Sequence, residues 1–292
     1  MDKDTLEKLC EKYKLTPEKH CECLQRIIKT TFYGKTPVEK PVLKIIMAQT
    51  GAGKNSLTEL AMRKNPNAVL VAGDNCKPFR HDAVELAQKY PTDFNAITRY
   101  DSHLHMFEVF EQVRSNNYNA IVEKAPSVSF KNFWGGYTVP NNYQIEYDIL
   151  AVSELNSVLS TRERYEQQIL FGAKSPKLTE LERHDDSFVA LQQAMNELDD
   201  IAVNVYIRGN SNDKIPIQVY PNVRFQTAKQ CMDYYRDIDN RNTLKEFPKR
   251  YRLLRNQMLQ RNAPKEQFEQ IVEIYKRYEQ MLYLYRENDI ER

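Results

Sequence analysis

"MAQTGAGKNS", from Met47 to Ser56, lies between an apolar run at 42–48 and a helical stretch at 54–64. A buried strand, a glycine-containing turn and a helix in this order are typical of a loop that binds phosphate groups. Backbone N–H groups at the start of such a helix attract anionic oxygens, and glycines let the chain approach them closely. Lys54 can then reach the outer phosphates of a nucleotide. The predicted nucleotide-binding residues are Gly51, Ala52, Gly53, Lys54, Asn55 and Ser56.

Two positions depart from the usual pattern, G-x-x-x-x-G-K-[S/T]. Ala48 replaces the first glycine, which is tolerable if its backbone lies in the ordinary β region. Asn55 replaces the Ser or Thr whose hydroxyl binds Mg²⁺, and its amide oxygen is also a hard ligand, so Asn55 is the predicted metal-binding residue. Ser56 points about 100° away around the helix and is a poor substitute. Two alternatives stay open: Asn55 as an adapted ligand, or as an inactivating change.

The length and composition indicate one large domain, or a domain with an extension, in a chain of 292 residues. The net charge of +2 argues against a general nucleic-acid or membrane binder. No apolar run approaches the roughly 18 residues of a membrane span, and the charged N-terminus does not resemble a signal peptide. Five unevenly spaced cysteines are expected to be reduced thiols, so we expect a cytoplasmic protein.

Apolar runs alternate with helical stretches along most of the chain. This pattern predicts an α/β fold with a mostly parallel sheet flanked by helices, as in P-loop kinases. We expect an N-terminal helical segment at 1–40, a core at 41–225 and a helical C-terminal extension at 226–292. The last two strands flank a turn and suggest a hairpin. The predicted strands are 42–48, 68–72, 119–123, 144–152, 201–207 and 215–220.

Two groups of histidines and cysteines are candidate metal ligands by residue type. The segment 20–23 reads His-Cys-Glu-Cys, but no second ligand pair follows it, so we expect a helix with incidental cysteines. His103 and His105 lie on a predicted helix at 97–116 but are not spaced i, i+4, so we expect them to be incidental. On that helix, the side chains expected to share the buried face are Leu104, Phe107, Phe110 and Val113.

Further motifs follow the loop in a characteristic order. They are "VLVAGDN" (69–75), "YNAIVEKAPS" (118–127), "STRERYEQQI" (160–169), "AKSPK" (173–177) and "HD" (184–185). With "GAGKNSL" before them, this series resembles the zeta toxin family of toxin–antitoxin systems. The resemblance implies a P-loop kinase that transfers the γ-phosphate of ATP or GTP, with Mg²⁺, to a sugar hydroxyl of UDP-N-acetylglucosamine. It also implies an antitoxin protein as partner.

The resemblance assigns roles to single residues. Lys54 matches the lysine of the phosphate loop, and Asp74 matches the catalytic aspartate that accepts the proton of the attacking hydroxyl. Arg164 matches an arginine that meets the nucleotide phosphates. Glu123, an acid that ends the third strand, matches a glutamate that faces the sugar substrate.

Several positions depart from the family pattern. Where the family has a second arginine this chain has Ala173, and the adjacent Lys174 could supply a point charge to the nucleotide. Lys124 and Ala125 replace the usual Gly-Thr after Glu123, and the loop 131–142 is a lid or merely a connection. His184 matches the family's His-Asp pair only after a gap and is expected to be structural, and no role is assigned to His81.

Three functions remain open on these grounds. The first is a zeta-toxin-like kinase of a nucleotide sugar. The second is a kinase of another small molecule or nucleotide cofactor on the same fold, because the residues after Glu123 differ from the family pattern. The third is a nucleotide-binding or protein-interaction module with weakened catalysis, for which Asn55 and Ala173 are the main support.

Overall fold

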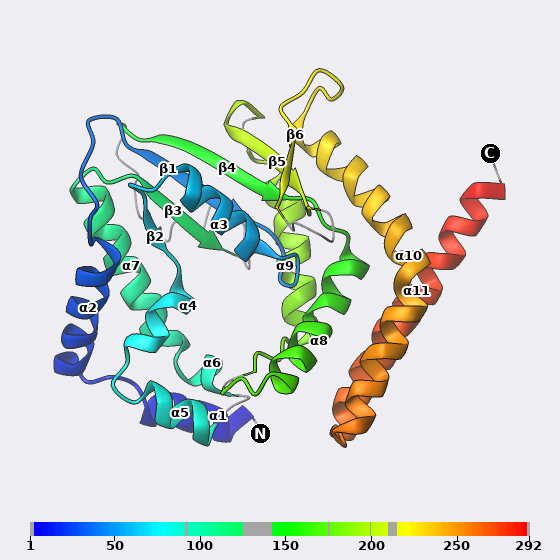
Figure 1. Cartoon of the computed structure of the whole chain (residues 1–292), viewed down its shortest axis with the longest axis horizontal. Helices are drawn as coiled ribbons and strands as arrows, with labels where there is room; N and C mark the ends of the chain where they lie inside the picture. The colour runs from blue at the N-terminus through cyan, green and yellow to red at the C-terminus, as the bar shows by residue number, and fades with distance from the viewer. Residues whose placement is uncertain are drawn as a thin grey trace.

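A six-stranded sheet forms the centre of the protein (Figure 1). The computed structural model describes residues 3–90, 93–124, 142–174, 176–198, 200–209 and 215–290. The strand order is β2-β3-β1-β4-β5-β6, and every neighbouring pair is parallel except the antiparallel pair β5–β6. The predicted fold class and terminal hairpin are confirmed. The strands are β1 (Val42–Met47), β2 (Val69–Val71), β3 (Ala120–Lys124), β4 (Gln144–Leu150), β5 (Val203–Ile207) and β6 (Ile217–Tyr220).

The strands β1, β2 and β3 are mostly buried, whereas β4 and β6 begin with exposed residues. Successive residues of β1 point to opposite faces, so Ile45 packs into one buried cluster and Ile46 into another. The cluster around Ile46 contains Leu57 and Ala61 of α3 (Lys54–Lys64). The cluster around Ile45 is covered by α7 (Arg99–Ser115), α9 (Leu181–Ala194) and parts of the terminal helices.

The segment after β2 forms several short helices. They are α4 (Gly73–Cys76), the 3₁₀ turn η1 (Lys77–Phe79), α5 (Ala83–Lys89) and α6 (Phe94–Ile97). A buried ion pair, in which Arg80 Nη1 lies 2.5 Å from Asp101 Oδ2, connects this segment to α7. Arg80 lies between η1 and α5, so the pair holds this connection against α7.

The predicted buried face of α7 is partly wrong. Phe110 and Val113 are buried as expected, but Leu104 is 38% exposed. The helix instead buries Asp101 and His105, because partners elsewhere in the chain satisfy these polar side chains. Apolar periodicity could not indicate this rotation, since two of the side chains that determine it are polar.

Helices at both ends of the chain pack against this core. They are α1 (Lys3–Lys12), α2 (Pro17–Thr31), α10 (Ala228–Gln260) and α11 (Lys265–Ile290). Thr16 caps α2, because its hydroxyl accepts a hydrogen bond from the Lys19 amide at 3.4 Å. Figure 1 shows α2 beside α7, and α10 and α11 side by side as a long hairpin. Within the described ranges, no helix combines the length and the apolar character that crossing a membrane requires.

Aromatic rings hold the C-terminal hairpin on α8 (Glu154–Leu170). Phe247 of α10 is fully buried and stacks on Tyr278 of α11, with ring centroids 4.3 Å apart. Ile271 and Ile274 of α11 are buried in the same cluster, whereas Val272 is 47% exposed. All five cysteines are unpaired, as expected.

Replacing Phe247 by Ala should lower the free energy of unfolding by about 3–5 kcal/mol, because it removes a buried ring and leaves a cavity between two helices. Urea denaturation followed by circular dichroism measures this change. Leu253→Ala, on the same helix but 55% exposed, is the matched control and should change stability by less than about 0.5 kcal/mol. Equal effects of the two substitutions would contradict the described packing.

Candidate active site

Two glycines give the turn between β1 and α3 its shape. Gly51 and Gly53 have φ values of 84° and 91°, in the left-handed region that favours glycine. A Cβ atom on Gly51 would lie 2.1 Å from the carbonyl oxygen of Ser157 in α8, so no side chain fits there. Ala48, in contrast, is not among the residues with positive φ, so the condition under which it can replace glycine is met.

Hydrogen bonds that involve polar side chains hold the loop against its neighbouring elements. The Gln49 amide donates to the Val152 carbonyl at 2.7 Å, and the Thr50 N–H donates to the Ser187 hydroxyl at 3.0 Å. His184 is fully buried and its Nε2 lies 2.9 Å from the Ser157 hydroxyl, which agrees with the structural role expected for it. These contacts fix the loop to the segment around α8 and α9.

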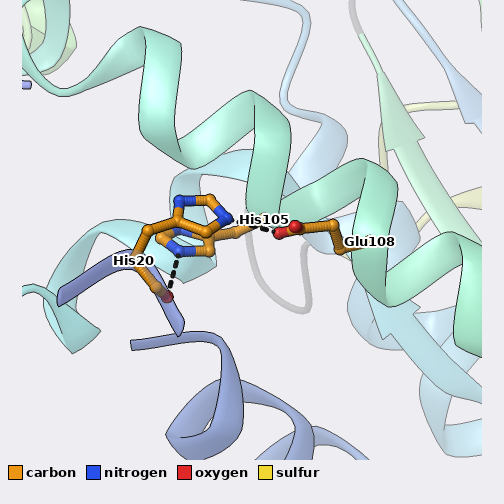
Figure 2. Close-up of side chains that lie close together, drawn as sticks. All are labelled: His20, His105 and Glu108. Atoms are coloured by element: carbon orange, nitrogen blue, oxygen red, sulfur yellow. Dashed lines mark hydrogen bonds and ion pairs between the residues drawn. The ribbon is translucent and has the colours of Figure 1, made fainter. Parts of the chain in front are cut away.

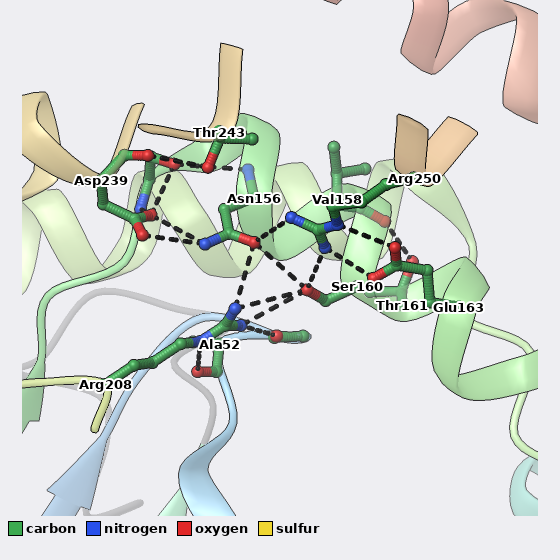
Figure 3. A network of polar contacts seen from close by, with 12 residues as sticks. Ala52, Asn156, Val158, Ser160, Thr161, Glu163, Arg208, Asp239, Thr243 and Arg250 are labelled. Atoms are coloured by element: carbon green, nitrogen blue, oxygen red, sulfur yellow. Dashed lines mark hydrogen bonds and ion pairs between the residues drawn. The ribbon is translucent and has the colours of Figure 1, made fainter. Parts of the chain in front are cut away.

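Arg208, which follows β5, binds the outer side of the loop (Figure 3). Its Nε donates to the Ala52 carbonyl at 2.9 Å, and its Nη2 donates to the Gly51 carbonyl at 2.7 Å. Because the peptide unit is planar and trans, a carbonyl turned toward Arg208 directs the next N–H to the opposite side. The sequence analysis missed Arg208, although an arginine directly after a strand at the same sheet edge was a signal for it.

The same network continues into the C-terminal helices (Figure 3). Arg208 Nη1 donates to the Asn156 side-chain carbonyl at 3.1 Å, and Arg250 Nη1 of α10 donates to the same oxygen at 2.8 Å. Arg250 also binds both carboxylate oxygens of Glu163, at 2.8 and 2.6 Å. The Asn156 amide donates to Asp239 of α10 at 2.8 Å. Thus α10 is connected to the phosphate-binding loop through one asparagine.

Lys54 begins α3 and lies close to an acidic side chain. Its Nζ donates to the Ala48 carbonyl at 3.3 Å. Burial lowers the pKa of Lys54 to about 8, an effect that the negative charge of Glu123 opposes. Glu123 accepts a hydrogen bond from the Thr58 hydroxyl of α3 at 3.2 Å. Glu123 therefore lies at the end of the sheet that carries the phosphate loop.

Asp74, in the first turn of α4, is held between two ammonium groups. Lys77 Nζ lies 2.5 Å from one carboxylate oxygen, and Lys177 Nζ lies 2.6 Å from the other. Burial raises the pKa of Asp74, but the charges of Lys177 and Lys77 outweigh it and hold this pKa well below its usual range. The Asp74 side chain is 61% exposed, so a ligand can reach it.

Further cations lie near Asp74. Burial lowers the pKa of both Arg164 and Arg183, and the charge of Asp74 partly opposes this in each case. Arg164 Nη2 donates to the Thr179 hydroxyl at 3.1 Å, while its Nε has no partner among the described residues. One carboxylate surrounded by several cations forms a site suited to an anionic ligand.

Some predicted residues lie elsewhere or outside the described ranges. Asn55 and Lys174 are both exposed, and Lys177 is the lysine of that segment that contacts Asp74. Ala125 and nearly all of the loop 131–142 fall outside the described residues, as does the side chain of Lys124.

The remaining histidines lie around the helices near Asp74. His81 is exposed and contacts Lys19, and His103 packs near Gly73. His105 is not an incidental surface residue, because it is only 1% exposed.

The sheet, the loop and the acidic residues together define a P-loop kinase-like fold. In this fold a parallel sheet carries a phosphate-type loop and acidic residues at one edge. The sequence profile of the zeta toxin family matches residues 25–221, more than half of the chain. The protein therefore belongs to the zeta toxin family, whose members are kinase-like phosphotransferases.

Individual relatives are distant. The chain is 22% identical over 182 residues to the toxin PezT of Streptococcus pneumoniae serotype 4, covering 62% of this chain and 72% of PezT. It is 24% identical over 157 residues to the toxin zeta of Enterococcus hirae, covering 52% of this chain and 54% of that toxin. The match thus spans about half the length of the Enterococcus toxin.

Two solved structures share the fold. A structure of the PezAT chromosomal toxin–antitoxin system of S. pneumoniae superposes with a TM-score of 0.65 at 19% identity, covering 82% of this chain and 98% of that chain. The AvrRxo1-ORF1:-ORF2 structure with ATP has a TM-score of 0.50 at 15% identity and covers 82% of this chain and 77% of that one.

The two loop glycines differ in a testable way. Gly51→Ala should destabilise the fold more than Gly53→Ala, because only Gly51 abuts a backbone carbonyl, whereas the nearest atom to a Cβ on Gly53 is Arg208 Nε at 3.7 Å. The strained φ alone costs about 1–2 kcal/mol at either position. Thermal denaturation of both variants measures the difference, and equal destabilisation would contradict the close contact with Ser157.

Proposed function

We propose that the protein is a kinase that transfers the γ-phosphate of ATP or GTP to a sugar hydroxyl of a nucleotide sugar such as UDP-N-acetylglucosamine. The observation that carries this proposal is that Lys54, Asp74 and Arg164 lie near one another, since the charges of Asp74 and Arg164 both act on the pKa of Lys54 and the charge of Asp74 acts on the pKa of Arg164. Phosphoryl transfer needs this combination, because its catalysis rests mainly on positioning and charge stabilisation.

The nucleotide half of the proposal rests on the loop. Gly51 to Ser56 would receive the phosphates on backbone N–H groups, and Arg208 keeps two loop carbonyls on the far side. Lys54 is half-buried, and a bound polyphosphate would raise its pKa again and keep it charged. Arg164 carries an unpaired Nε, a donor suited to the charge on the transferred group. The solved AvrRxo1 complex contains ATP, which is consistent with this assignment.

Asp74 would orient the acceptor. With its pKa held low, the carboxylate is ionised across the physiological range and is a weak base before bond formation. Its main role would be to accept a hydrogen bond from the attacking hydroxyl and to take up the proton as the new P–O bond forms. Lys177 and Lys77 fix the carboxylate and add positive charge for an anionic acceptor.

The donor set near Lys54 fits Mg²⁺. Glu123 supplies a carboxylate beside the phosphate loop, and Asn55 supplies an exposed amide in the first turn of α3, so both offer the hard oxygens that this ion prefers. When bound, Mg²⁺ neutralises charge on the outer phosphates. We propose that Glu123 binds Mg²⁺ and also contacts the acceptor.

Two further functions remain candidates. A nucleotide cofactor could replace the nucleotide sugar, because the residues after Glu123 differ from the family pattern. Alternatively, exposed Asn55 is compatible with a nucleotide-binding module of weakened catalysis. The family match and the PezAT toxin–antitoxin structure support an antitoxin protein as a partner of this chain.

Asp74→Asn should lower the rate of ATP consumption with the true acceptor by about 100-fold or more, because the amide cannot take up the proton. The assay measures ADP release over a panel of nucleotide sugars and dinucleotides, which also separates the candidate acceptors. Asp233→Asn is the matched control, since Asp233 also pairs with a lysine but lies on the surface of α10. Undiminished turnover by the Asp74 variant would remove the kinase assignment.

Asn55→Thr tests the metal position. We expect this variant to need less Mg²⁺ for half-maximal rate, because a hydroxyl is the usual ligand there, while its maximal rate stays within about tenfold of the native rate. Initial rates over a Mg²⁺ titration give both quantities. A far larger gain in maximal rate would instead identify Asn55 as inactivating.

A further inference from the structure

A cluster of metal-ligating side chains lies outside the proposed active site, between α2 and α7 (Figure 2). It contains His20 of α2 together with His105 and Glu108 of α7, which are spaced i, i+3 and so share one face of that helix. Each side chain offers one ligand atom, and these atoms lie within 4.8 Å of one another. The sequence could not connect them, because 85 residues separate the two histidines.

His105 has the surroundings of a metal ligand. It is 1% exposed, and its Nε2 lies 3.2 Å from the backbone carbonyl of His20. A carbonyl can only accept, so Nε2 carries the hydrogen. With the hydrogen on Nε2, the neutral ring keeps a lone pair on Nδ1. That atom has no hydrogen-bond partner in the described part of the chain.

We propose that His20, His105 and Glu108 bind a zinc ion that fastens α2 to α7. Two imidazoles and one carboxylate form a ligand set that zinc accepts, with water in a fourth position. The hydrogen bond from His105 Nε2 to a carbonyl is the type of outer contact that orients metal-bound histidines. Glu108 is 42% exposed, which leaves access for the ion and for water.

Binding requires a small rearrangement of His20. The two rings are stacked, with centroids 4.0 Å apart and planes 14° apart, so their in-plane lone pairs run nearly parallel. His20 Nε2 now contacts Glu108 Oε2 at 2.7 Å. The His20 side chain is 18% exposed and lies at the outer side of the pair, so it is the ring that tilts toward the ion. Zinc then replaces the hydrogen bond between His20 and Glu108.

The site joins the N-terminal helices to the helix behind the catalytic turn. A Cβ on Gly73, the residue before Asp74, would lie 3.5 Å from His103 and 3.7 Å from the Ser102 carbonyl, both in α7. An ion held by α2 and α7 therefore stabilises the helix against which the Asp74 turn rests, without contacting the nucleotide loop. This role does not depend on the proposed kinase activity.

Zinc titration of the full chain carrying Cys21→Ser tests the proposal, since Cys21 is an exposed thiol next to His20 that could bind zinc by itself. We expect calorimetry to give one equivalent of zinc, and the thermal midpoint to rise with zinc but not with Mg²⁺, because nitrogen ligands favour zinc. Co²⁺ in place of zinc should give the visible absorption of a four-coordinate site.

Single substitutions decide which residues bind the ion. Glu108→Gln and His20→Asn, both at partly exposed positions, should each weaken zinc binding by about tenfold or more. His81→Asn removes an exposed histidine that contacts Lys19 and is the control, with unchanged affinity expected. The proposal is overturned if zinc does not bind stoichiometrically, or if it binds equally well to the Glu108 and His20 variants.

Discussion

The close approach of Gly51 to the backbone of α8 is the constraint on which the rest of the site depends. A turn that lies against the Ser157 carbonyl can contain no side chain there, and it needs a left-handed conformation at two positions. Once the turn is seated, Arg208 binds its carbonyls and Lys54 begins α3 beneath it. The helix that receives the turn also carries Asn156, which binds arginines from β5 and α10. One contact thus aligns the loop, α8 and the C-terminal hairpin.

The charges around Asp74 support the proposal that these residues bind a ligand rather than form a structural network. A single carboxylate, Asp74, faces Lys77 and Lys177, with Arg164 and Arg183 nearby. The Asp74 side chain is 61% exposed, so a further anion can reach this group of cations. Burial lowers the pKa of Lys54, and the charges of Lys177 and Arg164 add to this effect. A structural ion-pair cluster would be expected to balance its charges internally.

Most of the fold could be predicted because the chain repeats a simple local pattern. All six predicted strands are present, and the two loop glycines adopt left-handed backbone conformations. The prediction was wrong for part of the buried face of α7, where Leu104 is exposed while Asp101 and His105 are buried. Asp101 pairs with Arg80, and His105 binds the His20 carbonyl. Such contacts cannot be read from hydrophobic spacing, because the residues that make them are polar.

The sequence by itself determined the phosphate loop, because strand, glycines, lysine and helix are contiguous and their conformations follow from local sterics. Through the family resemblance, it also indicated Asp74, which lies shortly after the end of β2 at Val71. Only the tertiary structure decided that Lys177 rather than Lys174 contacts Asp74, that Arg208 backs the loop, and that His20 meets His105. The physical reason is that these residues are far apart along the chain. Local spacing fixes only which neighbours a residue has within its own helix or strand. Contacts between elements depend instead on how the buried faces pack, and that is settled by the whole core at once.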